Sequence, residues 1–205
     1  MTRIAILDYG MGNLRSAEKA LEHVGAAAAV TRDHDRIRAA DGIVLPGVGA
    51  FPKAMGEVRR LGFDGLLRER LGAGVPVLGI CLGMQLLFEG STELGGAAGI
   101  GLLEGGVEEL AADGLKVPQI GWNPVSWRRE SELGEGLPEP CAFYHVHSFA
   151  PRPAREEDVV GTALYGAEFV SAVARPPLYG VQFHPEKSGP DGLRLLRNFV
   201  RVCAG

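Results

Sequence analysis

The sequence is poor in several features that would identify its class at once. It has only three cysteines, Cys81, Cys141 and Cys203, an odd number without short spacing, which argues against a disulfide framework. No apolar run approaches the roughly 18 residues that a membrane-spanning helix needs, and the N-terminus lacks the pattern of a signal peptide. We therefore expect a protein of the reducing cytoplasm without a membrane segment.

A surplus of charge of one sign is also lacking. The chain has 21 basic and 25 acidic residues, a net charge of -4, so nothing indicates a surface for nucleic acid or for an anionic membrane. Side-chain amides are scarce, with only three asparagines and three glutamines. This scarcity fits thermal adaptation as well as a GC-rich genome, so it decides nothing about function.

Glycine is abundant by contrast, with 30 of 205 residues, which indicates many tight turns or close approaches of the backbone. The hydrophobic share of 46% and the charged share of 22% are ordinary for a globular protein. No linker, repeat or low-complexity tract interrupts the chain. We expect residues 1–205 to form one domain.

The first half alternates short apolar strands with helices. Strands are predicted at 3–7, 26–31, 42–45 and 75–80. Helices are predicted from an N-cap at Asn13 to Gly25, at 52–71 with breaks at its glycines, and at 82–88. Such alternation is typical of a doubly wound parallel sheet with right-handed crossovers.

The second half is richer in strands. They are predicted at 116–127, 141–149, 159–165, 168–174 and 178–183, before a last helix at 191–203. The fold class expected is therefore α/β, with three layers, a mostly parallel open sheet covered by helices on both faces, and extra antiparallel strands in the C-terminal half.

The most informative segment is Gly79-Ile80-Cys81-Leu82-Gly83, which has the form of a nucleophile elbow between a buried strand and a helix. The helix N-terminus favours a thiolate at Cys81, and the N–H of Leu82 is placed to bind an oxyanion. The alternative is a buried structural cysteine, because cysteine is among the most buried residue types.

His184 and Glu186 are the predicted partners of Cys81. Pro185 keeps the segment extended, so the side chains of His184 and Glu186 point to the same side and the carboxylate can orient the imidazole. The alternative is that both face water. Since reactive groups gather at the carboxyl ends of parallel strands, we expect Cys81 and His184 to meet there.

A glycine loop, Pro46-Gly47-Val48-Gly49, follows the third strand at the same edge. Its backbone N–H groups, that of Gly49 above all, are candidates for the second oxyanion donor, although the motif alone also fits a plain turn. Glycines on both sides of Val48 let its peptide rotate cheaply.

No catalytic role is predicted for the remaining four histidines. The pair His145 and His147 fits the edge of a substrate pocket better than a metal site, because no third ligand with suitable spacing is apparent. His23 and His34 are expected on the solvated surface.

Taken together, these segments resemble the class I (triad) glutamine amidotransferases, and within them the glutaminase subunits of imidazole glycerol phosphate synthase. The resemblance covers nearly the whole chain in order, at residues 8–14, 46–51, 79–89, 91–93, 121–123, 144–148 and 184–188. Two residues depart from the family pattern. Phe149 stands where a tyrosine is expected, and Ile120 where methionine is common.

The resemblance implies that the chain hydrolyses glutamine to glutamate and ammonia without a cofactor or a metal. The residues implied are Cys81, His184 and Glu186 for catalysis, Gly49 and Leu82 for the oxyanion, and Gln85, Glu93, Ser148 and Phe149 for glutamine. Phe149 would act through its backbone.

The resemblance also implies a partner. Ammonia would pass to a (β/α)8-barrel cyclase subunit that makes imidazole glycerol phosphate and aminoimidazole carboxamide ribonucleotide in histidine biosynthesis. Asn13, Trp122, Tyr144 and Lys187 are the expected contacts in this heterodimer. If the loop at Val48 rests with a carbonyl in the oxyanion site, partner binding would switch the glutaminase on.

Three other functions stay open at this point. The chain could serve a different ammonia-using synthase, act as a peptidase-like Cys-His-acid hydrolase, or be a non-catalytic regulatory module. The last has no need of Cys81, His184 and Glu186.

Overall fold

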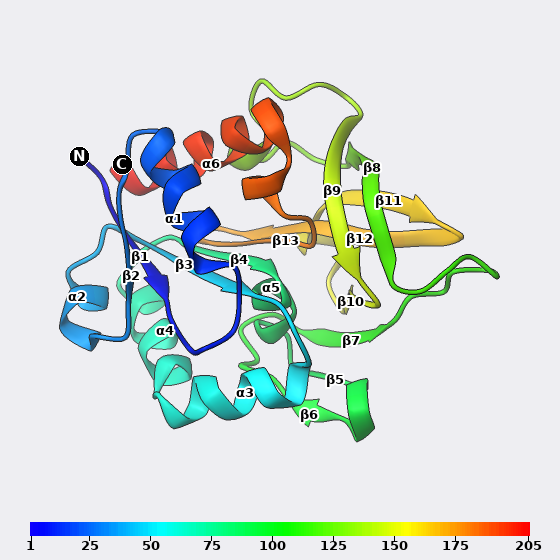
Figure 1. Cartoon of the computed structure of the whole chain (residues 1–205), viewed down its shortest axis with the longest axis horizontal. Coiled ribbons are helices and arrows are strands. Elements are labelled where there is room, and N and C mark those ends of the chain that lie inside the picture. The colour runs from blue at the N-terminus through cyan, green and yellow to red at the C-terminus, as the bar shows by residue number, and fades with distance from the viewer.

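The computed structural model describes all residues 1–205 and contains a nine-stranded sheet and a smaller four-stranded sheet (Figure 1). In spatial order the large sheet consists of β2 (Ala27–Thr31), β1 (Arg3–Leu7), β3 (Gly42–Gly47), β4 (Val77–Cys81), β13 (Leu178–Val181), β12 (Ala167–Arg175), β11 (Val159–Tyr165), β8 (Gln119–Trp127) and β9 (Cys141–His147). Pairing is parallel from β2 to β13 and antiparallel from β13 to β9. The structure thus has the predicted parallel region with an antiparallel extension.

Helices cover both faces of the parallel strands. They are α1 (Leu14–His23), α2 (His34–Arg38), α3 (Phe51–Arg60), α4 (Phe63–Gly72), α5 (Leu82–Leu86) and α6 (Gly189–Ala204). In β1, Ile4 and Ile6 pack in one apolar cluster with residues of α1 and α6, and the next residues along, Ala5 and Leu7, pack in a second cluster with residues of α2, α3 and α4. Because both faces are covered, the strand reads as a continuous apolar run.

The boundaries of α1 show how local signals act. Asn13 occupies the N-cap position as predicted, but its side chain makes no capping hydrogen bond. Gly25, with φ +96°, follows the helix, and its N–H bonds to the carbonyl of Glu22. The helix therefore ends where a left-handed residue is available.

Several element boundaries differ from the sequence prediction. The predicted strand at 141–149 is two strands, because the chain passes at Ser148 from β9 into β10 (Phe149–Pro153). The smaller sheet has the order β10, β7 (Gly105–Glu109), β5 (Gly90–Ser91) and β6 (Ala97–Ala98). The helical region predicted at 52–71 is broken by a glycine, as expected, into two helices separated at Gly62, whose φ is +68°.

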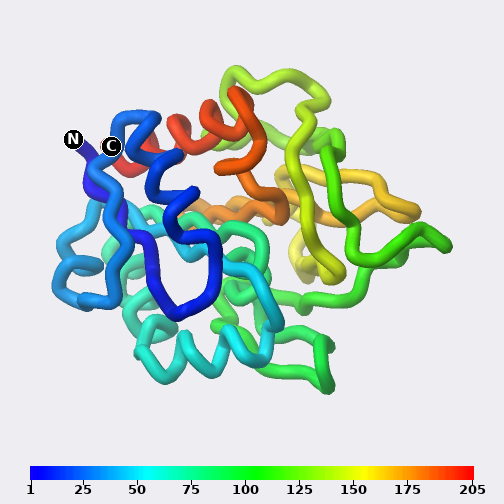
Figure 2. The backbone as a smooth tube through the Cα atoms, in the orientation of Figure 1, coloured from blue at the N-terminus to red at the C-terminus, as the bar shows by residue number.

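Strand register determines which segments meet at the carboxyl edge of the parallel strands. Gly47 pairs with Cys81 across β3 and β4, and Ile80 pairs with Val181 across β4 and β13. The loop after β3, the end of β4 and the segment after β13 therefore lie side by side. Figure 2 shows the two chain termini near each other, away from this edge. None of the helices combines the length and the apolar character that a bilayer crossing demands.

Candidate active site

Cys81 lies at a strained turn between β4 and α5. Its φ of +54° and ψ of -114° are unusual for a residue with a side chain. A Cβ on Gly79 would lie 2.7 Å from the backbone of Met84, and one on Gly83 would overlap the carbonyl oxygen of Leu45. Both glycines of the motif are thus needed for the close approach of α5 to the sheet, and the predicted elbow is present.

His184 and Glu186 form a buried pair at the end of the strand next to β4. The Nδ1 of His184 lies 2.8 Å from Oε1 of Glu186, and the two side chains are 3% and 4% exposed. The backbone at His184 is extended, as Pro185 predicts, and its N–H donates to the carbonyl of Tyr144. With Nδ1 donating to the carboxylate, the other ring nitrogen, Nε2, is the one available to Cys81.

The charge of the His184 ring is set by its neighbours. Burial alone would lower the pKa of His184, but the neighbouring Cys81 and Glu186 raise it above its ordinary value of 6.5. These two neighbours thus favour the protonated form of the ring. The structure brings Cys81, His184 and Glu186 together.

A cavity of about 220 Å³ opens beside the sulfur. Seven of the predicted site residues line it: Gly49, Cys81, Leu82, Gln85, Glu93, Ser148 and Phe149. They come from loops and helix ends far apart in sequence, and the carboxyl edge of the sheet gathers them.

The carbonyl of Phe149 is a central acceptor in this cavity. It accepts one hydrogen bond from Nε2 of Gln85, at 2.9 Å, and one from Nδ1 of His147, at 2.9 Å. Both hydrogen bonds of residue 149 seen here are made by the main chain, so they do not depend on whether the side chain is phenylalanine or tyrosine. Glu93, predicted for the substrate ammonium, also accepts from the backbone N–H of Phe51, at 2.8 Å.

Gln182, which no sequence motif had indicated, lies between these groups. Its Oε1 accepts from Gln85 at 3.0 Å, and its Nε2 lies 3.6 Å from the sulfur of Cys81. The sequence did contain a hint of this residue. It is a glutamine between the apolar residues Val181 and Phe183, directly before the predicted catalytic His184.

The glycine loop after β3 presents unpaired backbone groups to the cavity. Val48 and Gly49 both line it, and neither N–H donates a hydrogen bond within the chain. Gly49 has φ +119°, and Val48 is 42% exposed. The start of the loop is anchored by Tyr9, whose hydroxyl donates to the carbonyl of Pro46 at 2.6 Å. Burial raises the pKa of Tyr9, so this donor keeps its proton.

The two histidines of β9 differ in position. His147 lines the cavity, as predicted, whereas His145 is fully buried behind it and bonds to Phe143 and Ser171. Burial lowers the pKa of His145 to about 3 and that of His147 to about 4, so both rings are neutral. No cluster of three or more His, Cys, Asp or Glu side chains suited to a metal ion is present.

The other two histidines lie away from the site. His23 is exposed, as expected. His34 is half-buried rather than solvated, because its Nε2 bonds to the carbonyl of Leu61 at 2.8 Å and its ring packs on Phe63.

Three of the residues predicted to contact a partner, Trp122, Tyr144 and Lys187, lie around the segment that follows His184, and the fourth, Asn13, is the N-cap residue of α1. Trp122 is 58% exposed, and its ring lies 6.2 Å from that of Tyr144 on the neighbouring strand. Asn13 and Lys187 are exposed. The ring of Trp122 also approaches Gly189, close to Lys187 in sequence.

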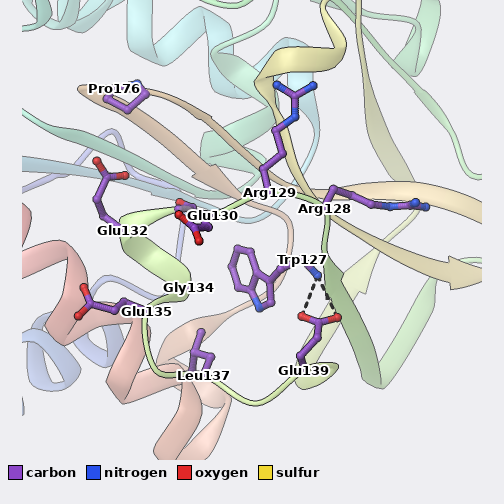
Figure 3. Close-up of a pocket in the computed structure, with 11 residues that line it drawn as sticks. Trp127, Arg128, Arg129, Glu130, Glu132, Gly134, Glu135, Leu137, Glu139 and Pro176 are labelled. Carbon is purple, nitrogen blue, oxygen red and sulfur yellow. Dashed lines mark hydrogen bonds between the residues drawn. The ribbon is translucent and has the colours of Figure 1, made fainter.

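A larger hollow of the surface lies elsewhere. Figure 3 shows it around Trp127, whose backbone N–H donates to the carboxylate of Glu139. This groove of about 1020 Å³ is lined mainly by charged side chains, with no cysteine or histidine among them. Size alone therefore does not mark the reactive site.

Comparison with known proteins gives a consistent result. The family model "Glutamine amidotransferase class-I" matches residues 5–203. The chain is 51% identical over 199 residues to "Imidazole glycerol phosphate synthase subunit HisH" of Moorella thermoacetica, covering 97% of this chain and 94% of the relative. It is 50% identical to the protein of the same name from Symbiobacterium thermophilum, covering 99% and 96%. Among solved structures, PurLQS from Thermotoga maritima has a TM-score of 0.77 at 20% identity and 98% coverage of both chains, which shows the fold.

Proposed function

This chain belongs to the class I glutamine amidotransferase family, and we propose that it is the glutaminase subunit of an imidazole glycerol phosphate synthase of histidine biosynthesis. The near full-length similarity to subunits of that name supports the assignment. We further propose that residues 1–205 act as one amidotransferase domain, since both apolar clusters include residues of the same large sheet.

The observation that carries the proposal is the grouping of Cys81, His184 and Glu186 beside the cavity. Cys81 attacks as a thiolate, with the imidazolium of His184 as its counterion. The sulfur adds to the side-chain amide carbon of glutamine. Glu186 holds the imidazolium in the orientation that directs Nε2 at the reaction.

The negative oxygen of the tetrahedral intermediate needs backbone N–H donors that point at it. The N–H of Leu82 and that of Gly49 take this role, and the unpaired state of the Gly49 N–H supports it. His184 then donates its Nε2 proton to the amide nitrogen, the C–N bond breaks, and ammonia leaves.

A glutamyl thioester on Cys81 remains. The neutral His184 takes a proton from water, the water oxygen adds to the thioester carbon, and the C–S bond breaks to release glutamate. The thiolate and the imidazolium are restored, so the cycle needs no cofactor.

Glutamine is recognised at its amino-acid end. The carboxylate of Glu93 suits the substrate ammonium, and Gln85 offers a polar side chain beside it. Backbone groups of Ser148 and Phe149 complete the contacts, and all four residues line the cavity.

The ammonia must reach a second active site, because in water it becomes ammonium, which is not a nucleophile. We assign that site to a (β/α)8-barrel cyclase subunit docked on the face of Asn13, Trp122, Tyr144 and Lys187. The exposed Trp122 beside Tyr144 supports this face, since aromatic residues are enriched at interfaces. The cytoplasm is the compartment for this pathway enzyme.

The test is glutamate formation from glutamine by this chain alone, with the cyclase subunit, and with the cyclase plus its nucleotide substrate. We expect the fastest turnover with all three, because the partner turns the Val48 peptide to its donating orientation. No glutamate under any condition would refute the glutaminase. Equal rates with and without the partner would refute only the loop switch.

A further inference from the structure

Gln182 is a buried amide that the mechanism above does not use. The chain has only three glutamines, and Gln85, Gln119 and Gln182 are 5%, 3% and 0% exposed. Glutamine is mostly an exposed residue, so a fully buried one needs partners. Those of the Gln182 side chain are the amide of Gln85 on one side and the sulfur of Cys81 on the other.

The orientation of both amides follows from the carbonyl of Phe149. A carbonyl oxygen can only accept, so the Gln85 atom that lies 2.9 Å from it is the nitrogen. The same nitrogen lies 3.0 Å from the side chain of Gln182, which must therefore present its oxygen there. It follows that the Gln182 atom 3.6 Å from the sulfur of Cys81 is the nitrogen, a donor.

This chain of hydrogen bonds has a consequence at Gln85. Both of its N–H groups are engaged, one by Phe149 and one by Gln182. Its Oε1 has no partner within the chain, and the residue lines the cavity, so Gln85 meets the substrate as an acceptor.

A second consequence arises at Cys81. The sulfur lies 3.8 Å from the carbonyl of Val146, which can accept from a thiol but repels a thiolate. The N–H of Gln182 faces the sulfur as a donor, and a donor favours the charged form of the group that it meets.

We propose that Gln182 is a positioning residue that orients Gln85 toward glutamine and stabilises the thiolate of Cys81. This inference rests on the proposed function, because it assigns Gln85 to the substrate and Cys81 to nucleophilic attack. One amide thus links substrate recognition to the nucleophile.

Two substitutions separate the two roles. Gln182→Glu keeps an acceptor for Gln85 but removes the donor to the sulfur and adds a negative charge beside it. Gln182→Leu removes both contacts. Asn198→Leu is the matched control, because Asn198 is also a buried amide that donates to two carbonyls, those of Leu133 and Glu135, and it lies outside the cavity lining.

The experiment measures glutaminase kinetics of the complex and, on the same proteins, the rate of iodoacetamide modification of Cys81 against pH. Mass spectrometry identifies the modified cysteine. For Gln182→Glu we expect the modification profile to move at least about one pH unit upward and kcat to fall about 10- to 100-fold, the effect of a lost hydrogen bond to a charged group. Its KM for glutamine should stay within about threefold of wild type, since the acceptor for Gln85 remains.

Gln182→Leu removes the donor without adding a charge, so its profile shift and its loss in kcat should be smaller than those of Gln182→Glu. Its KM for glutamine should rise about tenfold, because the amide of Gln85 is no longer held. Asn198→Leu should lower the melting temperature without moving the profile or KM. A folded Gln182→Leu with the wild-type profile, kcat and KM would overturn the proposal. The proposal would also be overturned if Gln182→Leu lost only kcat, and by no more than Asn198→Leu does. If the wild-type complex itself makes no glutamate, the proposed function fails, and the modification profile still tests the contact with Cys81.

Discussion

Gly47 lies directly opposite Cys81 across the parallel pair β3–β4. This register places the glycine loop beside the sulfur, and with it the unpaired N–H groups of Val48 and Gly49. A Cβ on Gly47 would overlap the hydroxyl of Tyr9, so the strand end has no room for a side chain. The nucleophile and the loop assigned to the oxyanion are therefore positioned by the same sheet.

Gly49→Ala should impair the chemical step. An added Cβ would lie 2.5 Å from the terminal methyl of Met11, and alanine is strained at φ +119°. We expect the loop to shift its N–H away from the oxyanion and kcat to fall about 100-fold, as for loss of one such donor. Steady-state kinetics of the complex measure this.

Gly74→Ala is the control for the strain itself. Gly74 has φ +79° with open space around it, so the change should destabilise the fold by about 1–2 kcal/mol without affecting kcat. Equal kinetic losses in both variants would show that general strain, and not the loop, explains the effect.

Glu186→Gln should lower kcat about 10²- to 10⁴-fold, because a neutral amide neither stabilises the imidazolium of His184 nor fixes its tautomer. Glutamine binding should change little, since Glu186 does not line the cavity. Glu139→Gln, which alters a carboxylate bonded to the backbone at Trp127, serves as the comparison. Wild-type turnover in Glu186→Gln would remove this residue from the mechanism.

Local signals pointed to the candidate catalytic residues because these belong to short motifs at strand ends. The five residues around Cys81 and the run from His184 to Glu186 each carry their own backbone constraint. The doubly wound topology then predicts that they meet.

Features that depend on contacts between residues far apart in the sequence could not be predicted from the sequence. The bonds of Gln182 to Gln85 and Cys81 span 97 and 101 residues, and no local pattern encodes them. The passage from β9 into β10 was missed for a similar reason. The strand-like sequence continues without a turn signal through Ser148, and only pairing with β7 draws Phe149–Pro153 into the smaller sheet.

Trp122→Glu should weaken binding of the cyclase subunit. The ring is 58% exposed beside Tyr144, and a buried charge at an interface without a partner is costly. We expect the Kd to rise at least about tenfold, a loss of about 1.4 kcal/mol. Titration calorimetry measures this, and unchanged modification of Cys81 shows that the fold is intact. An unaltered Kd would place the partner on another face.

Acid should destabilise the fold through His145. Its folded pKa of about 3 lies below the ordinary value of 6.5, so unfolding takes up a proton and stability falls as the pH drops below 6.5. His147, with a pKa of about 4, acts in the same direction.

His145→Asn tests this, because an amide can still donate toward Phe143 but does not titrate. Between about pH 4.5 and 6, the slope of unfolding free energy against pH should be smaller in the variant than in wild type by about 1.4 kcal/mol per pH unit. This is the slope that the uptake of one proton on unfolding produces. Urea unfolding at several pH values gives the slopes. Parallel slopes for variant and wild type would contradict a neutral buried ring.

The most direct measurement of the central claim uses Cys81→Ala in complex with the cyclase, with either glutamine or an ammonium salt as the nitrogen source. The account predicts that product formation from glutamine disappears while formation from ammonium stays at the wild-type rate. Continued synthesis from glutamine by this variant would contradict the account, because the sulfur would then not be the group that releases ammonia.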